Sequence, residues 1–258
     1  MSAYTSTLNA SIGMQAETVR LLELWEPGMT AAQVYDIALA SGDFPTMSAR
    51  RLRNFVTESF APCCLAAEGR PALVLKQLQP CVSKPVFNQL HFLYTSRAHP
   101  LLGDFVRQLY WPAYMAGREE ITNQDARLFV SDANRAGLTT STWTDNTVQR
   151  VARYLTGSCA DFGLLEPGTR QKRKILPFRL AQPVAIFLAY DLHFGGLGDN
   201  LILTHPDWEL FGLDRHDVLD QLKRLGPQAG LIIQSASGAV RIDWSYRTLE
   251  EVLDVIAG

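Results

Sequence analysis

The segment TDNTVQRVARYLTGSCADFGLL, residues 144–165, decides the fold of the middle of the chain. Its apolar residues recur at the three- and four-residue spacing that places them on one helix face. These residues are Val148, Val151, Ala152 and Leu155. The opposite face carries the polar and basic residues Asn146, Gln149, Arg150 and Arg153. Because the Thr144 hydroxyl can cap the first turn, the segment predicts an amphipathic helix.

A second helix is predicted over residues 122–137, directly before this one, and Gly137 ends it. The stretch LTTSTWT between them turns the chain, so the pair predicts a helix-turn-helix. The run 170–179 that follows contains no acidic residue. Its basic residues include Arg170, Lys172, Arg173 and Lys174. A helix-turn-helix followed by a short basic hairpin is typical of a winged helix.

The N-terminal region repeats the first part of this pattern. Helices are predicted over residues 15–26 and 31–41, and Thr30 can cap the second one. After the turn at residues 42–45, the stretch SARRLRNFVTESF predicts a helix with Leu52, Phe55 and Val56 on its apolar face. The other side carries Arg50, Arg51, Arg53 and Asn54. These residues fit either a nucleic-acid contact or an ordinary solvated basic face.

The rest of the chain predicts further helices and one more hairpin. Residues 71–120 are an apolar, aromatic-rich helical block that prolines punctuate, and the alternation around Ser237-Gly238 predicts a β-hairpin. We therefore expect a mainly α fold with small β-hairpins, in which helix-turn-helix and winged-helix modules surround a helical connector. The expected domains are 1–70, helix-turn-helix-like; 71–120, connector; 121–180, winged-helix-like; and 181–258, acidic and winged-helix-like.

Composition indicates a globular protein, with 47% hydrophobic and 19% charged residues. Residues 1–180 carry 19 Lys and Arg against 15 Asp and Glu, a net charge of +4, whereas residues 181–258 carry 5 against 11, a net charge of −6. This asymmetry favours a polyanion-facing body with an acidic end. The four cysteines show neither zinc spacing nor a disulfide framework, and no secretory or membrane-spanning segment is recognisable. We expect a cytoplasmic protein with no membrane association.

The sequence predicts no active site, metal site or cofactor site. The stretch GGLGDN, residues 195–200, follows a helix and lacks the Lys-Ser/Thr of a phosphate loop, so a turn is the better interpretation. No hydrolase or metalloprotease motif occurs, and Cys63-Cys64 lies in an apolar stretch typical of a core. Asp214, Asp217 and Asp220 form an acidic stripe on one helix, which would repel phosphates. The expectation is a protein that is not an enzyme.

Two basic segments are candidates for nucleic-acid contact, and the second along the chain favours it over the alternative of a basic solvent loop between domains. Arginine binds phosphate or the guanine edge through two hydrogen bonds, and asparagine and glutamine can bind adenine. The second helix of a helix-turn-helix enters the major groove, and lysines and arginines of a wing contact the backbone. The region around Arg150 and Lys172 is the stronger candidate because helix face and wing would point at one duplex.

Four stretches make the chain resemble the BrxA family of BREX phage-defence systems. They are TSTLNASIGMQAETVRLLELWEPG near the start, HPLLGDFVRQLY at 99–110, WTDNTVQRVARYLTGSCADFGLL at 143–165 and KRKILPFRL at 172–180. The resemblance covers essentially the whole chain and implies a mostly helical protein with winged-helix character that binds double-stranded DNA. It also implies partners in the same system, namely a methyltransferase, an ATPase and a phosphatase-like protein, and no catalysis by this chain.

Our leading hypothesis is therefore a non-enzymatic accessory subunit that binds double-stranded DNA in antiviral defence. Two other classes remain open. One is an interaction scaffold whose winged helices bind partner subunits, which the acidic C-terminal segment fits. The other is an RNA-binding or transcription-regulatory module.

Overall fold

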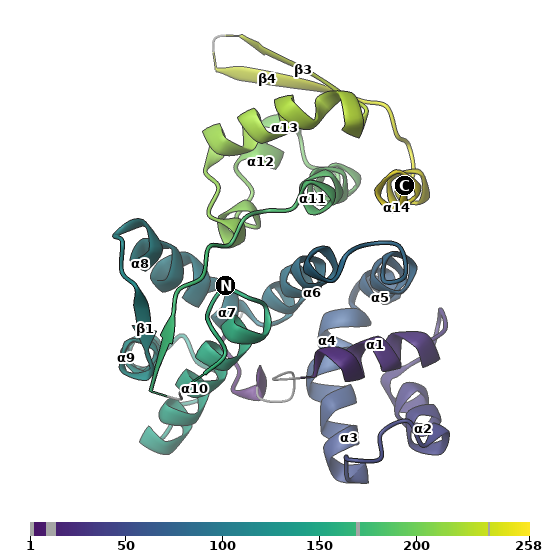
Figure 1. The fold of residues 1–258 in the computed structure, drawn as a ribbon. Helices are drawn as coiled ribbons and strands as arrows, with labels where there is room; N and C mark the ends of the chain where they lie inside the picture. Colours follow the sequence, from purple (N-terminus) through teal and green to yellow (C-terminus); the bar gives the residue numbers. More distant parts are fainter. Residues whose placement is uncertain (1–2, 9–13, 169–170, 237) are drawn as a thin grey trace. The chain divides into compact units, whose positions relative to one another are not determined.

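A computed structural model of the protein describes residues 3–8, 14–168, 171–236 and 238–258 (Figure 1). The described chain is mainly helical with small antiparallel β-structure, as the sequence predicts, and its two sheets have two strands each. It forms two compact units. The first comprises Met1–Lys76 and Tyr94–Phe178, and the second comprises Gln77–Leu93 and Arg179–Gly258. Each unit thus combines two separated stretches, whereas the four domains expected from the sequence are consecutive segments.

The first N-terminal helices begin and end where local sequence signals place them. They are α1 (Gln15–Leu24), α2 (Ala31–Ser41) and α3 (Ala49–Phe55). Thr30 caps α2 in a reciprocal capping box with Gln33, and Gly42 ends the helix in the left-handed conformation. Buried Phe44 anchors the turn that follows, and Ser48 accepts the Arg51 N–H to cap α3.

Helix α3 continues without a break into a wider π-helical turn and a short helix before the chain bends. These elements are η2 (Val56–Phe60), α4 (Ala61–Cys64) and α5 (Ala66–Leu78). Within α5 the residues Ala67, Glu68 and Gly69 have left-handed φ angles of 46°, 59° and 80°, which bend the chain sharply. Gly69 lies against buried Trp25, so the bend brings α5 onto the end of α1.

The apolar block expected at residues 71–120 is helical and largely buried. Its remaining elements are α6 (Lys84–Ala98), α7 (Pro100–Phe105), the π-helix η3 (Val106–Tyr110) and α8 (Trp111–Met115). Pro100 stands in the first turn of α7, where a missing N–H costs little, and Pro112 follows directly after the π-helix η3. Tyr110 is fully buried, and its hydroxyl donates to the Leu176 carbonyl at 2.8 Å.

The two strands of a small sheet flank the central helix pair in sequence. Strand β1 (Glu120–Thr122) leads into α9 (Asn123–Arg135) and α10 (Asp145–Asp161), and β2 (Lys172–Lys174) returns antiparallel to β1. On its other side the β2 segment continues the ladder with residues 164–166. Lys174 accepts the Glu166 N–H, and Leu176 donates to Leu164, both at 2.9 Å. The basic run therefore forms one strand between two others, and its hairpin partner is 164–166.

Most of the second unit follows the first in sequence. Its remaining elements are α11 (Gln182–Phe194), α12 (Asp199–Leu203), the 3₁₀-helix η4 (Trp208–Phe211), α13 (Arg215–Ala229), β3 (Leu231–Ala236), β4 (Ala239–Trp244) and α14 (Leu249–Ala257). The hairpin expected around residues 237–238 is confirmed, with Ile233 opposite Ile242. The Tyr190 hydroxyl joins α11 to the end of α13 through the Ala229 carbonyl at 2.8 Å.

No helix in the described ranges has both the length and the hydropathy needed to cross a bilayer.

Candidate nucleic-acid interface

Helix α10 presents the polar face that the sequence predicts. Thr144 accepts the Thr147 N–H at the N-terminus. The predicted inner residues Val148, Val151, Ala152 and Leu155 are all buried. The predicted outer residues Asn146, Gln149, Arg150 and Arg153 all lie at the surface, and both arginines belong to the solvent-facing side of the helix. The alternation arises because residues three and four apart share one face of a helix.

The two arginines of this face keep their charge available. Within the part of the chain that the structure describes, neither Arg150 nor Arg153 forms an ion pair with an acidic side chain. Both guanidinium groups are therefore able to bind an external anion without first breaking an internal pair. Asp145, in the first turn of the helix, is an exposed acid nearby in sequence.

The turn before α10 is held in place by one amide side chain. Asn134, near the end of α9, donates from Nδ2 to the Trp143 carbonyl at 3.0 Å and accepts the Trp143 N–H at Oδ1 at 2.9 Å. The same Oδ1 accepts the Thr139 hydroxyl at 3.1 Å. Asn134 thus fixes both polar groups of the residue that precedes the Thr144 cap. Sequence reasoning missed this role because it depends on a pairing nine residues away.

The basic strand divides its charges between its two sides. Lys172 and Lys174 are exposed, and Lys172 forms an ion pair with Glu120 of β1 at 2.9 Å. Arg173, one residue out of phase, is half-buried and donates to the Glu166 carbonyl at 3.3 Å. The lysines are the solvent-facing cations of this strand, and Arg173 lies against the protein. Arg170, the fourth basic residue predicted here, lies outside the described residues.

Arg173 lies near a buried thiol. Burial raises the pKa of the Cys159 thiol, and the positive charge of Arg173 opposes that rise in part. Cys159 therefore stays protonated, whereas a reactive cysteine needs a lowered pKa. Burial likewise raises the pKa of Cys64, which lies in the core as the sequence predicts.

The arginine helix α3 carries a second exposed basic surface. Leu52, Phe55 and Val56 are buried as expected. Arg50, Arg51, Arg53 and Asn54 are all exposed. The Arg53 guanidinium carbon lies 5.0 Å from the centre of the Tyr35 ring on α2, within cation–π range. No sequence pattern singles out Tyr35 as a partner, because the contact crosses the turn between the two helices.

We group the described members of the predicted set by the elements that carry them, and we call the two groups the α10 cluster (α10 and β2) and the α3 cluster. The α10 cluster consists of Asn146, Gln149, Arg150, Arg153, Lys172 and Lys174, and the α3 cluster consists of Arg50, Arg51, Arg53 and Asn54. Both clusters belong to the first unit, on separate helix pairs.

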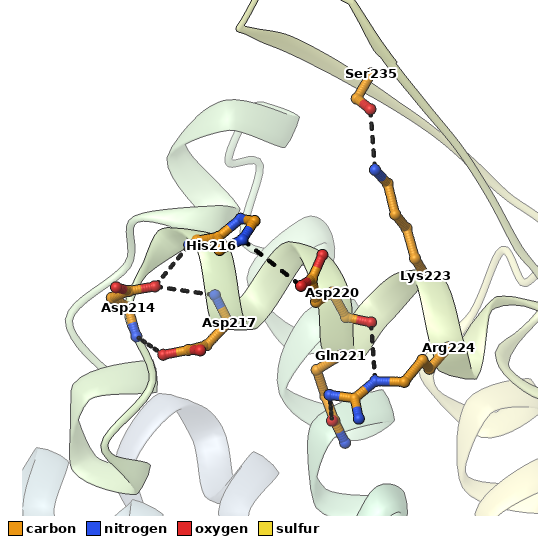
Figure 2. Close-up of polar contacts among 8 residues, drawn as sticks. All are labelled: Asp214, His216, Asp217, Asp220, Gln221, Lys223, Arg224 and Ser235. Carbon is orange, nitrogen blue, oxygen red and sulfur yellow. Dashed lines mark hydrogen bonds and ion pairs between the residues drawn. The ribbon is translucent and has the colours of Figure 1, made fainter.

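Helix α13 of the second unit uses its acidic residues locally (Figure 2). Asp214 is the N-cap and accepts the N–H groups of His216 and Asp217, while Asp217 accepts the Asp214 N–H. Hydrogen bonds from the Asp217 and His216 N–H groups lower the pKa of Asp214. Asp220 lies 3.7 Å from His216. The expected acidic stripe is present, and part of its charge stabilises the positive end of its own helix.

Basic residues of α13 are also engaged within the second unit. Lys223 donates to the Ser235 hydroxyl of β3 at 3.0 Å, and Arg224 donates to the Gln221 side chain at 3.1 Å (Figure 2). Both side chains belong to exposed residues. They supply a matched pair of exposed basic residues for comparison with Arg150 and Arg153.

A family model, BrxA, matches residues 2–191 of the chain. The matched range includes both basic clusters and most of α11, and the elements from α12 to α14 follow it. No curated protein matches the chain.

Proposed function

The chain belongs to the BrxA family and so has a role associated with BREX systems. From this premise, we propose that it is a non-enzymatic subunit that binds double-stranded DNA through its first unit. The exposed arginines Arg150 and Arg153 on the outer face of α10, which form no ion pair within the described residues, carry this proposal. The other BREX proteins are its expected partners.

The strand and helix order around α10 supports a winged-helix interpretation. Strand β1 precedes the helix pair α9–α10, and the two strand segments 164–166 and 172–176 follow it. The last segment lies between the other two, pairing with both. In a winged helix this arrangement makes the second helix of the pair the recognition helix and the final hairpin the wing. Helix α10 and the lysines of β2 would then contact the same duplex.

The side chains of the α10 cluster suit this task chemically. Arginine offers two parallel N–H donors to phosphate or guanine, and the amides of Asn146 and Gln149 match the adenine edge. Lys172 and Lys174 would contribute charge without sequence preference. The proposal therefore includes steep salt dependence and modest specificity.

The α3 cluster is proposed as a second contact. Its helix also follows a helix and a turn, and its arginines are exposed. The stacking of Arg53 on Tyr35 would limit the rotamers of that guanidinium before DNA binds. Restricting a side chain in advance reduces the entropy lost on binding.

The test is fluorescence-anisotropy binding of a random-sequence duplex of about 30 base pairs between about 50 and 200 mM salt. We expect wild type to bind with an affinity that falls steeply with salt. Arg150→Glu/Arg153→Glu should weaken binding at least about tenfold and lower the log–log salt slope by about two, because two phosphate-neutralising groups are lost. Lys172→Glu/Lys174→Glu and Arg50→Glu/Arg53→Glu test the strand and α3 in the same way.

The matched control is Lys223→Glu/Arg224→Glu, which makes the same charge change on an exposed helix of the second unit. This variant should bind almost as wild type does. If it loses as much affinity as the α10 variant, the binding reflects net charge alone. If wild type shows no salt-sensitive binding, the DNA proposal is wrong.

A scaffold for partner proteins is the second candidate, and exposed apolar side chains favour it. Met115 on α8 is 73% exposed and Leu128 on α9 is 52% exposed. Exposed apolar side chains of this size are candidate contact points for a partner protein. Met115→Ser/Leu128→Ser, which leaves the net charge unchanged, should release BREX partners in a pull-down and leave duplex binding as it is in the wild type if this candidate is right. Competition of the duplex by structured RNA tests the RNA alternative.

A further inference from the structure

The N-terminal segment pairs with the turn between α9 and α10. Tyr4 donates its N–H to the Leu138 carbonyl at 2.8 Å and accepts the Thr140 N–H at 3.0 Å. These bonds make a parallel β-bridge between Tyr4 and Thr139. The backbone on both sides of Thr139 is therefore tied to a residue far away in sequence.

The Tyr4 side chain fastens this pairing to a third element. It is 7% exposed, and its hydroxyl donates to Asp104 of α7 at 2.6 Å. The bond is short because its acceptor is a carboxylate. Asp104 also accepts a hydrogen bond from Arg107 at 3.2 Å. Burial and the bond to Asp104 raise the pKa of Tyr4, so its hydroxyl keeps the proton that it donates.

The other end of α10 is also held by an N-terminal residue. Gln15, the first residue of α1, donates from Nε2 to the carbonyl of Asp161 at 2.5 Å. Asp161 is the last residue of α10. Residues 4 and 15 thus contact the turn before the helix and the last residue of the helix. Together they tie the turn before α10 and the last residue of α10 to N-terminal residues.

We infer that Tyr4, through Asp104, is a positioning residue for duplex binding: the bonds of Tyr4 to the turn at residues 138–140 and to Asp104 hold α10 in the orientation that its arginines need. This inference rests on the proposed function of α10. Paired arginine–phosphate or arginine–guanine contacts tolerate only small errors in placement. An α10 that tilts or frays at its N-terminal turn loses such contacts although every contacting side chain is still present.

The direction in which Asp104→Ala changes duplex affinity separates this positioning role from a simple effect of net charge. Asp104→Ala removes a negative charge from the first unit, so charge counting predicts stronger binding to a polyanion. The positioning role predicts weaker binding, by about tenfold, because the Tyr4 hydroxyl loses its acceptor. Asp104→Asn keeps an acceptor oxygen, and we expect it to restore binding to the wild-type level or above.

Tyr4→Phe provides the complementary change, because it removes only the hydroxyl. We expect a similar loss of affinity with an unchanged salt slope, since no phosphate contact is deleted. Tyr190→Phe is the matched control: it removes a buried tyrosine bond to the Ala229 carbonyl in the second unit. It should lower thermal stability and leave duplex affinity unchanged. Affinities are measured well below the melting temperature of each variant.

Hydrogen exchange supplies a readout that does not depend on DNA. Amides of residues 138–144 should exchange faster in Tyr4→Phe and Asp104→Ala than in wild type and Asp104→Asn. Binding by wild type together with unchanged affinity in Tyr4→Phe, or tighter binding in Asp104→Ala, would overturn the inference and leave the proposed function intact. No binding by wild type would overturn the proposed function, and the inference with it. If Tyr4→Phe does not fold, the pair Asp104→Ala and Asp104→Asn still decides the question.

Discussion

At the scale of single residues, burial changes the pKa of a histidine, His99. His99 is 5% exposed at the start of α7, and burial lowers its pKa from the ordinary value of 6.5. The nearby Cys63 has the opposite, smaller effect. The sequence favours a core or surface histidine here over a metal ligand. The structure places it in the core, where charging its ring is costly.

His99 should therefore make stability depend on pH. The unfolded chain binds a proton at His99 near pH 6.5, whereas the native state binds it only at lower pH. Stability should fall as pH decreases below about 6.5, by up to about 1.4 kcal/mol per pH unit, and the loss should level off below the native pKa. Urea unfolding between about pH 5 and 8 tests this. His99→Gln should flatten the dependence; an identical slope in this variant would assign it to other groups.

At the scale of elements, the bend in α5 depends on a glycine that touches a tryptophan. Gly69 has a φ of +80°, and a Cβ built there would lie 2.7 Å from Cζ2 of Trp25. The backbone angle favours glycine, and the lack of space beside Trp25 excludes a Cβ unless the ring shifts. Trp25 is 2% exposed and cannot move aside without opening the contact between α1 and α5.

Gly69→Ala should destabilise the protein by more than backbone strain alone. A left-handed alanine costs about 1–3 kcal/mol, and the clash with Trp25 adds to this. Gly163→Ala is the matched control, because Gly163 has a φ of +81° and a Cβ at this position would meet nothing within 4 Å. Equilibrium denaturation of both variants should give a larger loss for Gly69→Ala. Equal losses would show that packing against Trp25 contributes nothing.

At the scale of the whole molecule, both units are built from separated stretches of chain. In the second unit Gln89 of α6 donates to the Arg179 carbonyl at 2.8 Å and accepts the Ala181 N–H at 2.9 Å. Phe92, also from α6, meets the Phe211 ring edge-on at 5.9 Å. A segment near residue 90 is thus joined to the C-terminal third of the chain.

The grouping into two units also changes the charge balance that residues 1–180 and 181–258 show. The first unit carries 17 Lys and Arg against 15 Asp and Glu, a net charge of +2. The second unit carries 7 against 11, a net charge of −4.

Gln89→Ala should loosen the second unit specifically. It removes two part-buried hydrogen bonds to the backbone, each of which contributes about 0.5–1.5 kcal/mol to stability. Hydrogen exchange should rise in residues 77–93 and 179–190, with little change in residues 144–161. Gln108→Ala, at an exposed glutamine of η3, is the control and should leave exchange unchanged. Faster exchange throughout the chain would indicate that the two units unfold together.

The sequence by itself determined the features that local physics governs. The apolar spacing of α10, the Thr144 cap and the exposed arginines of α3 and α10 follow from helix periodicity and capping, which act within a few residues. The hairpin β3–β4 follows from alternation around a glycine turn. Pairing across long separations left no such signal. The Tyr4–Asp104 bond spans 100 residues, β1 and β2 meet across two helices, and Gln89 binds a segment 90 residues away.

Only the tertiary structure decided which basic side chains face solvent and which of them have a partner within the protein. Strand alternation turned Arg173 inward, Glu120 took up Lys172, and Tyr35 came to lie under Arg53. Each outcome depends on a partner brought close by the fold, because ion pairs, ring contacts and buried hydrogen bonds act over a few ångströms of space and not over sequence distance. Residue type and spacing therefore determined the candidate faces, and long-range packing selected the side chains that those faces present.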